Sequence, residues 1–110
     1  MNLSMKVINE YLIVSLNGEL DHHTSEEIRK KVDQKYFNQN LKNIILDLRG
    51  LKFMDSSGIG LVMGRYKNCK EKNGDVAIVS TNPYINRMLN MSGLPKIINI
   101  YSSMEEAIID

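Results

Sequence analysis

Short apolar runs alternate with amphipathic segments along this chain, and that alternation limits the fold more than any other feature of the sequence. The runs 43–48 (NIILDL) and 75–80 (DVAIVS) are typical of strands buried on both faces of a parallel sheet. The segments beside them repeat apolar residues at the spacing of one helix face. Strands that alternate with helices predict an α/β domain, with a mostly parallel sheet joined by right-handed crossovers.

The start of the chain predicts an antiparallel hairpin. Runs 6–8 and 11–16 are apolar, and the break between them is short enough for a tight turn. Asn17 and Gly18 are expected to end the second strand. With a last strand at 96–100, the predicted order is β-β-α-β-α-β-α-β-α, a mixed sheet with about four helices.

Capping residues mark three of the predicted helix starts. Thr24 with Glu27, and Ser103 with Glu106, fit the capping box, in which two side chains satisfy amides at the helix start. The pair Asn82-Pro83 is an N-cap followed by proline at the first helical position.

The helix expected at 57–72 has two kinds of face. Its predicted core stripe consists of apolar residues spaced at about 100° per residue: Ile59, Val62, Met63, Tyr66 and Cys69. Gly60 and Gly64 lie off that stripe, and Leu61 lies nearly opposite it. In one interpretation the glycines permit close packing on the sheet. In the other they leave a bare outer face, with Leu61 as an apolar contact, where a partner approaches.

A length of 110 residues and a formal net charge of +1 narrow the class of protein. The length is typical of one domain, so residues 1–110 are expected to form a single domain. Nucleic-acid and anionic-membrane binders normally carry a strong positive field, so neither partner is expected.

One cysteine excludes an internal disulfide, and the apolar runs are shorter than the roughly 18 residues of a transmembrane helix. Without a signal-peptide pattern, the chain is expected to be cytoplasmic.

Three loops follow predicted strands at their carboxyl ends, where the functional groups of open α/β sheets gather. They span 18–24, 50–57 and 80–83. In the middle loop, Ser56 can be the N-cap of the next helix. The same place suits a phosphate, because free amides and the helix dipole stabilise a dianion there. Asp55 has the opposite effect, because its carboxylate would repel that phosphate. A phosphate here would be tolerated by the helix while it inverts the local surface chemistry, as a reversible switch requires.

The residues also suggest a metal site and a serine hydrolase site, and both lack part of the required pattern. The residue types in Asp21-His22-His23 are those of metal ligands. Consecutive histidines point in different directions, and no third ligand is near in sequence, so no metal is expected. A serine hydrolase that uses Ser56 would need G-x-S-x-G, and Met54 stands at its first glycine. No phosphate-cradling glycine loop is present, so no cofactor is expected, and Cys69 is expected to be inert core packing.

Four segments closely resemble the STAS-domain anti-sigma factor antagonists. They are GELDHHT at 18–24, FMDSSGIG at 53–60, GRYK at 64–67 and MSGL at 91–94. The resemblance spans nearly the whole chain, and the first two segments are highly specific together. It implies the STAS fold, whose strand and helix order agrees with the predicted one, and a partner-switching protein that is not an enzyme.

In that family the unphosphorylated antagonist binds an anti-sigma factor that is also a serine kinase, and the sigma factor is released. The kinase phosphorylates the serine after the aspartate of this loop, and a serine phosphatase reverses the step. The resemblance therefore implies that Ser56 is phosphorylated and that the protein regulates sporulation-specific transcription. The implied partner surface consists of Asp21, Asp55, Ser57, Gly58, Ile59, Gly60 and Leu61. Arg65 and Lys67 are expected to be solvated charges or contacts at its rim.

Two alternatives to this function stay open. One is a STAS module of another partner-switching or stress-response pathway, since related chains could carry the DHHT segment. The other, which lacks the elbow motif, is a small serine hydrolase that uses Ser56. Phosphate on Ser56 after incubation with the kinase and ATP would favour the switch, and ester turnover that Ser56→Ala removes would favour the hydrolase.

Overall fold

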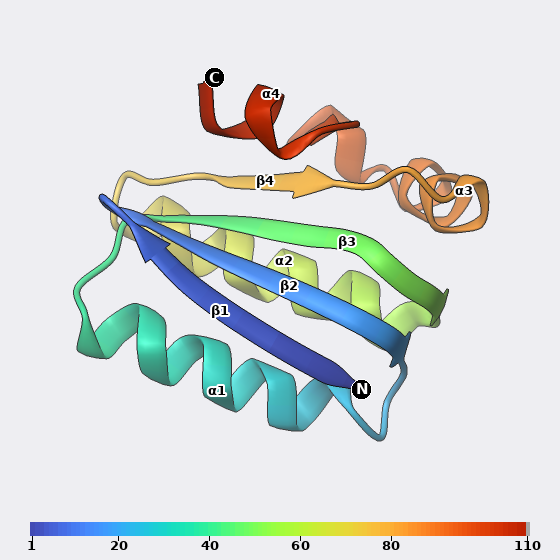
Figure 1. Cartoon of the computed structure of the whole chain (residues 1–110), viewed down its shortest axis with the longest axis horizontal. Coiled ribbons are helices and arrows are strands. Elements are labelled where there is room, and N and C mark those ends of the chain that lie inside the picture. The colour runs from blue at the N-terminus through green and yellow to red at the C-terminus, as the bar shows by residue number, and fades with distance from the viewer. Residues whose placement is uncertain (110) are drawn as a thin grey trace.

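A five-stranded mixed sheet forms the centre of the fold (Figure 1). The computed structural model describes residues 1–109, and the side chains of residues 1–108. The strands follow one another across the sheet in chain order: β1 (Asn2–Ile8), β2 (Tyr11–Leu20), β3 (Asn43–Met54), β4 (Val76–Val79) and β5 (Asn99–Tyr101). β1 pairs antiparallel with β2 and the other neighbours pair parallel, which confirms the predicted mixed sheet with its N-terminal hairpin.

The part of the chain that the structure describes contains four α-helices, in the predicted order among the strands. They are α1 (Ser25–Asn38), α2 (Ser56–Glu71), α3 (Pro83–Ser92) and α4 (Met104–Ile109), with a short 3-10 turn at Leu94–Lys96. The α/β class is thereby confirmed. Within residues 1–109, no helix has the length and apolar character needed to cross a membrane.

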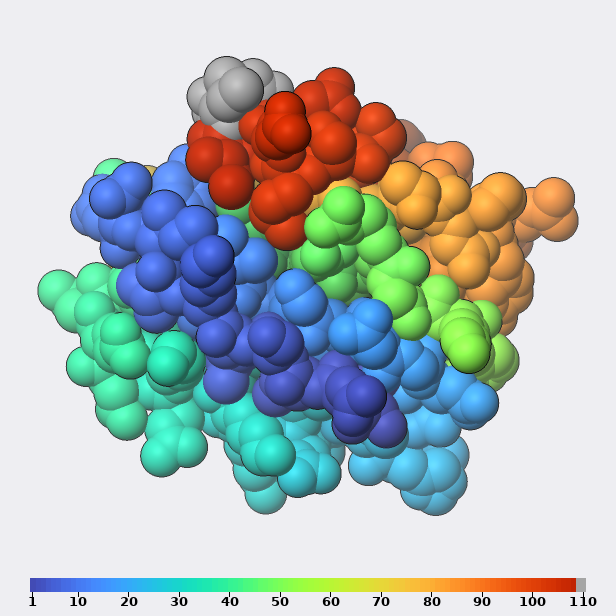
Figure 2. Space-filling view, in the orientation of Figure 1, coloured from blue at the N-terminus to red at the C-terminus, as the bar shows by residue number. Residues whose placement is uncertain are grey.

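Two cores of unequal size lie on the two faces of the sheet. The larger joins strand residues such as Leu12 and Val14 to buried residues of α1, α2 and α3, among them Val32 and Ile85. Successive strand residues point to opposite faces, and the smaller core under α4 consists of Ile13, Ile45, Val79 and Ala107. Figure 2 shows the side of the molecule where α4 lies, with parts of β2 and β3 visible beside that helix.

The strands β2 and β3 run further than the sequence predicts. Asn17 and Gly18 do not end β2, because the strand bulges there and continues to Leu20 by pairing with the end of β3. Gly18 takes a φ of 112°, which residues with a side chain rarely adopt. Gly50 pairs with Asn17, and a Cβ on Gly50 would collide with the Asn17 side chain. Pairing with a neighbouring strand therefore outweighs the local turn signal.

Two of the predicted helix caps form. Asn82 Oδ1 accepts a hydrogen bond from Tyr84 N at 2.8 Å. Ser103 Oγ accepts one from Glu106 N at 3.3 Å, and the Ser103 hydroxyl donates to Oε1 of Glu106 at 3.1 Å. Both starts are set by residues within a few positions of each other, so the local sequence is sufficient to predict them.

The capping box predicted at the start of α1 is wrong. Thr24 is the N-cap residue, but its side chain bonds no amide of the helix. The Thr24 hydroxyl instead donates to the Glu19 carbonyl at 3.2 Å and accepts from Asp21 N at 3.1 Å. Glu27, the expected second member of the box, forms an ion pair with Lys31 at 3.1 Å. Thr24 therefore stabilises the loop before α1.

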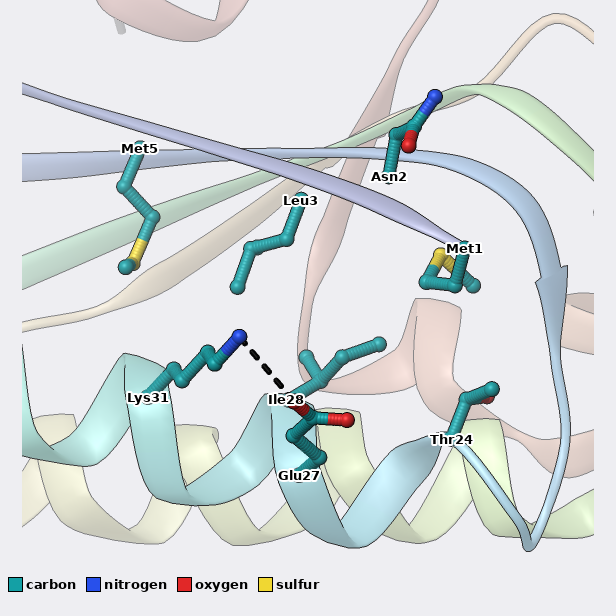
Figure 3. Close-up of a pocket in the computed structure, with 8 residues that line it drawn as sticks. All are labelled: Met1, Asn2, Leu3, Met5, Thr24, Glu27, Ile28 and Lys31. Atoms are coloured by element: carbon teal, nitrogen blue, oxygen red, sulfur yellow. Dashed lines mark ion pairs between the residues drawn. The ribbon is translucent and has the colours of Figure 1, made fainter.

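A cavity of about 490 Å³ lies between β1 and α1. Glu27 and Lys31 both line it (Figure 3).

The last strand begins later than predicted. Gly93 ends α3 in the left-handed region, with a φ of 84°. The residues after it form the 3-10 turn, which includes Lys96. The strand predicted at 96–100 therefore starts at Asn99.

Candidate functional site

Two of the predicted functional loops lie side by side at the carboxyl end of the sheet. Asp55 N donates to the Leu20 carbonyl at 3.2 Å, which links the residue after β3 to the end of β2. In return, His22 N donates to Oδ2 of Asp55 at 3.3 Å, across 33 positions of sequence. The loop that carries Asp21 and His22 is therefore tied to the start of α2.

Asp55, and not Ser56, is the N-cap of α2. Oδ1 of Asp55 accepts a hydrogen bond from Ser57 N at 2.8 Å, and its backbone carbonyl accepts one from Gly58 N at 2.9 Å. The expected capping role of Ser56 is wrong, because the helix begins one residue earlier than predicted. Asp55 thus uses one carboxylate oxygen for its own helix and the other for the neighbouring loop.

Ser56 is the first residue of α2, and its side chain is exposed. Within the described residues, its hydroxyl makes no hydrogen bond. The free amides of the first helical turn and the positive end of the helix dipole favour a phosphate at this position. The hydroxyl is therefore open to a modifying enzyme, and the helix end can accommodate the product.

The carboxylate of Asp21 is engaged within its own loop. Oδ1 of Asp21 accepts hydrogen bonds from His23 N at 3.0 Å and from Thr24 N at 3.1 Å. Burial works to raise the pKa of Asp21, but the hydrogen bonds from Thr24 and His23 outweigh it and keep the pKa below its ordinary value. Asp21 is therefore charged at neutral pH, in the loop that is bonded to Asp55.

The glycines in the first half of α2 have different surroundings. A Cβ on Gly58 would lie 2.3 Å from Cγ of Met54, so Gly58 permits close packing against β3. A Cβ on Gly60 or Gly64 would meet no atom within 4 Å. Close packing therefore describes Gly58, whereas the bare outer face describes Gly60 and Gly64.

Leu61 is buried, contrary to the expectation that it projects from the outer face. It is 5% exposed and belongs to the larger core. The helix packs against α1 as well as against the sheet, so one apolar stripe describes only one of its buried sides. Cys69 packs in the same core as expected, and burial raises the pKa of its thiol.

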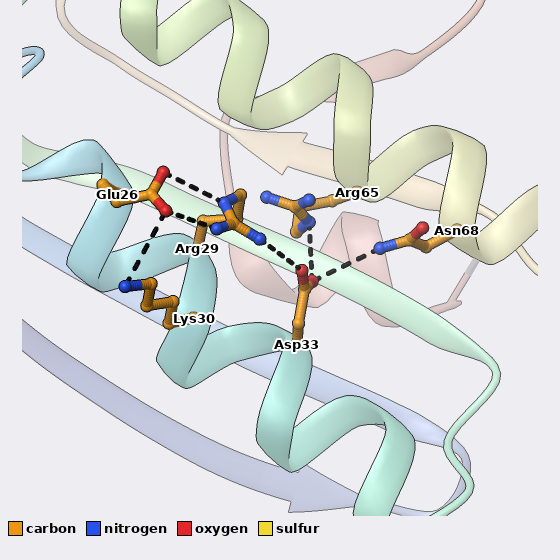
Figure 4. A network of polar contacts seen from close by, with 6 residues as sticks. All are labelled: Glu26, Arg29, Lys30, Asp33, Arg65 and Asn68. Carbon is orange, nitrogen blue, oxygen red and sulfur yellow. Dashed lines mark hydrogen bonds and ion pairs between the residues drawn. The ribbon is translucent and has the colours of Figure 1, made fainter.

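Arg65 is also buried, although a solvated charge or a rim contact was expected. Its Nε lies 2.9 Å from Oδ1 of Asp33 in α1. Asn68 Nδ2 donates to the same oxygen at 3.3 Å, and Nη1 of Arg29 lies 3.7 Å from Oδ2 of Asp33 (Figure 4). Burial lowers the pKa of Arg65, and Asp33 opposes that shift. This network ties α1 to α2, while Lys67 is exposed.

Phe53 and Tyr84 form an aromatic pair that the sequence motifs do not reveal. Their ring centroids are 6.4 Å apart, and the two residues are 39% and 44% exposed. The Tyr84 hydroxyl donates to the Met54 carbonyl at 3.3 Å, so it holds the backbone just before Asp55. The one available signal is position, since both aromatics follow predicted parallel strands at their carboxyl ends.

The two adjacent histidines lie ring to ring at the surface. The ring centroids of His22 and His23 are 4.0 Å apart. Among residues 1–109, no three His, Cys, Asp or Glu side chains are grouped so that they could hold a metal ion.

Comparisons with known proteins agree with this fold. The STAS domain family matches residues 2–107. An anti-sigma F factor antagonist of Paenibacillus polymyxa is 43% identical over 112 residues, which cover 100% of this chain and 96% of that protein.

Two solved structures share the fold over nearly the whole chain. The anti-sigma factor antagonist SpoIIAA in its unphosphorylated form has a TM-score of 0.85 and 32% identity, and the match covers 97% of this chain and 93% of that one. The Bacillus cell fate determinant SpoIIAA in its phosphorylated form has a TM-score of 0.77 and 33% identity, over 97% and 96% of the two chains. The chain thus belongs to the STAS-domain family and, within it, to the anti-sigma factor antagonists.

Proposed function

We propose that this protein is an anti-sigma factor antagonist that switches partners through phosphorylation of Ser56. The observation that carries the proposal is the position of Ser56. It is exposed and unpartnered at the first residue of α2, where the loops after β2 and β3 are bonded together. The 43% identical antagonist of Paenibacillus polymyxa supports the function, and the relative solved in a phosphorylated form supports the switch.

In the unphosphorylated state, the partner docks over Ser56 and the bare face of α2. The contact surface consists of the residues of this region that are exposed or half-buried: Asp21, Asp55, Ser57, Ile59 and Gly60. Gly58 and Leu61 are buried, so they shape this surface from below. Because Gly60 carries no side chain, a partner backbone can approach the helix closely.

Phosphorylation of Ser56 ends that contact by electrostatics. A phosphoserine carries about −1.5 to −2 charges at pH 7, and at Ser56 they lie next in sequence to the carboxylate of Asp55. The N-terminus of α2 tolerates a dianion, so the fold persists. Removing such a charge from water at an interface is costly unless a cation meets it, so the partner dissociates.

The partner of the unphosphorylated protein is an anti-sigma factor with serine kinase activity. Its capture releases the sigma factor for sporulation-specific transcription, and a serine phosphatase acting on phospho-Ser56 restores the antagonist. The protein works in the cytoplasm without a cofactor, without direct contact to nucleic acid or membrane, and without catalytic activity of its own. The anti-sigma F relative supports this pathway over a stress-response pathway.

Mass spectrometry of the protein after incubation with ATP and the anti-sigma F factor of Paenibacillus polymyxa tests this function. We expect phosphate on Ser56 of the wild type and none on Ser56→Ala. Ser4→Ala is the control, because Ser4 is exposed on β1 outside the proposed contact surface, and it should be labelled like the wild type. Phosphate on the Ser56→Ala chain would overturn the assignment, and ester turnover that Ser56→Ala abolishes would indicate the hydrolase.

A further inference from the structure

A groove between α1 and α2 continues the bare face of α2. It has a volume of about 220 Å³ and begins beside Ser57, the residue after the proposed phosphorylation site. Gly60 and Gly64 contribute to its α2 wall, and a Cβ on either would meet nothing within 4 Å. A partner chain can therefore approach the backbone of α2 along this groove.

Arg65 lines the groove, and two of its guanidinium nitrogens make no hydrogen bond within the described residues. Arg65 is 5% exposed, and these two nitrogens, Nε and Nη1, are themselves buried. Nε lies 2.9 Å from Asp33 as an ion pair, but its N–H does not donate to that carboxylate. Figure 4 shows the guanidinium between the two helices, with Asp33 on one side. Buried donors of a charged group are costly without an acceptor, and the ion pair with Asp33 leaves these donors without a hydrogen bond.

We propose that the groove is the docking site for a carboxylate side chain of the anti-sigma factor, which accepts hydrogen bonds from Arg65. This inference rests on the proposed function and adds the chemistry of the partner. A carboxylate fits better than a neutral acceptor, because hydrogen bonds to ionised groups are roughly twice as strong. Gly60 and Gly64 let the segment that bears the carboxylate come close enough to reach a buried cation.

The charges around the groove suit an acidic side chain from outside. The carboxylate of Asp33 does not interact with Arg65 alone. It also accepts a hydrogen bond from Asn68 and forms an ion pair with Arg29. Glu26, the acidic residue on the groove wall, is already paired with Arg29. Arg29 also lies on the groove wall, where it pairs with both Glu26 and Asp33 and so balances their charges.

Calorimetric titration with the purified anti-sigma F factor of Paenibacillus polymyxa tests the groove on unphosphorylated variants. Gly64→Leu fills the groove while it leaves the ion pair of Arg65 in place, and we expect it to weaken binding about tenfold or more. Glu71→Leu is the matched control, because Glu71 is exposed on the same helix outside the groove. It should bind within about twofold of the wild type. Thermal unfolding shows that both variants are folded.

Arg65→Lys tests the donors themselves. Lysine keeps a positive charge near Asp33 but lacks the planar fork of N–H donors. We expect weaker binding, with a loss that is non-additive with an Asp→Asn or Glu→Gln change of one carboxylate on the partner. A lower melting temperature with unchanged affinity would show a structural role only, and it would overturn the docking site.

The outcomes separate this inference from the function on which it rests. If the wild type binds and Gly64→Leu binds equally well, the groove is overturned and the proposed function stands. If the wild type does not bind, both are overturned. Saturation by sodium phosphate alone, seen as a shift of the Arg65 Nε–H signal in NMR, would make the groove a site for small anions and would overturn the protein carboxylate.

Discussion

At the scale of single residues, Gly58 and Gly60 stand two positions apart in α2 and face opposite surroundings. A side chain on Gly58 would collide with Met54, whereas the space beside Gly60 is open. We expect Gly58→Ala to lower the free energy of unfolding by about 1–3 kcal/mol through overpacking. Gly60→Ala should be neutral or raise it by up to about 1 kcal/mol, because alanine favours the helix. Urea unfolding measures both, and equal losses would contradict this description of the helix.

Asp55 has two structural roles, and its variants separate them from its charge. Asp55→Ala removes the cap of α2 and the acceptor for His22 N, so we expect a loss of about 1 kcal/mol in the free energy of unfolding. Asp55→Asn keeps one side-chain oxygen that can cap the helix and should lose less. Chemical denaturation compares the two variants, and equal losses would mean that the cap contributes no stability.

At the scale of elements, β3 carries a buried carboxylate whose charge stabilises the strand. Asp47 is 9% exposed, and Nε and Nη2 of Arg49 each donate to it at 2.9 Å. The Arg49 hydrogen bonds hold the pKa of Asp47 below its ordinary value, against the effect of burial. A depressed folded-state pKa gives stability that is complete above the unfolded-state pKa and is lost as the pH falls through the folded-state pKa.

Asp47→Asn should therefore lower the free energy of unfolding at pH 7 by about 1 kcal/mol, at the low end for such bonds because Arg49 is half exposed. The difference between wild type and variant should shrink as the pH falls into the acid range where Asp47 is protonated. Urea unfolding at a series of pH values gives this difference. A gap that stays constant down to that range would show that the charge of Asp47 does not stabilise the fold.

The ends of elements show which features the local sequence can predict. The cap at Asn82 needs only an amide two residues away, so its pattern in the sequence predicts it. The cap expected of Thr24 fails because Asp21 and Glu19 compete for its hydroxyl in a folded loop. The turn signal at Gly18 is overridden by pairing with β3, whose residues lie far along the chain. A local pattern therefore fails where a folded loop offers competing partners, as at Thr24, or where a distant strand pairs with the segment, as at Gly18.

At the scale of the whole molecule, the sequence predicts some features of the candidate site and misses others. Parallel strands end at one edge of the sheet, so the sequence predicts that the loops of Asp21 and Ser56 gather there. It does not predict that Leu61 and Arg65 are buried. Their burial depends on how α2 rotates against α1, where Asp33 meets Arg65. The docking groove follows from that packing, and no motif encodes it.

The charge that phosphorylation adds matters for where it lies on the surface of the molecule. A formal net charge of +1 is small enough for one phosphate to reverse its sign. The added charge would stand beside Asp55, in the region bonded to the loop of Asp21. We therefore expect the effect of phosphorylation to arise at this surface and not from the net charge.

In the proposed switch, phosphorylation of Ser56 controls partner binding, and an affinity titration in three states of the protein tests this control. A single preparation is titrated with the anti-sigma F factor of Paenibacillus polymyxa before phosphorylation, after it, and after removal of the phosphate. We expect binding in the first and last states, and an affinity at least about a hundredfold lower in the phosphorylated state, because desolvating the new charge is costly. Equal affinity in all three states would contradict it.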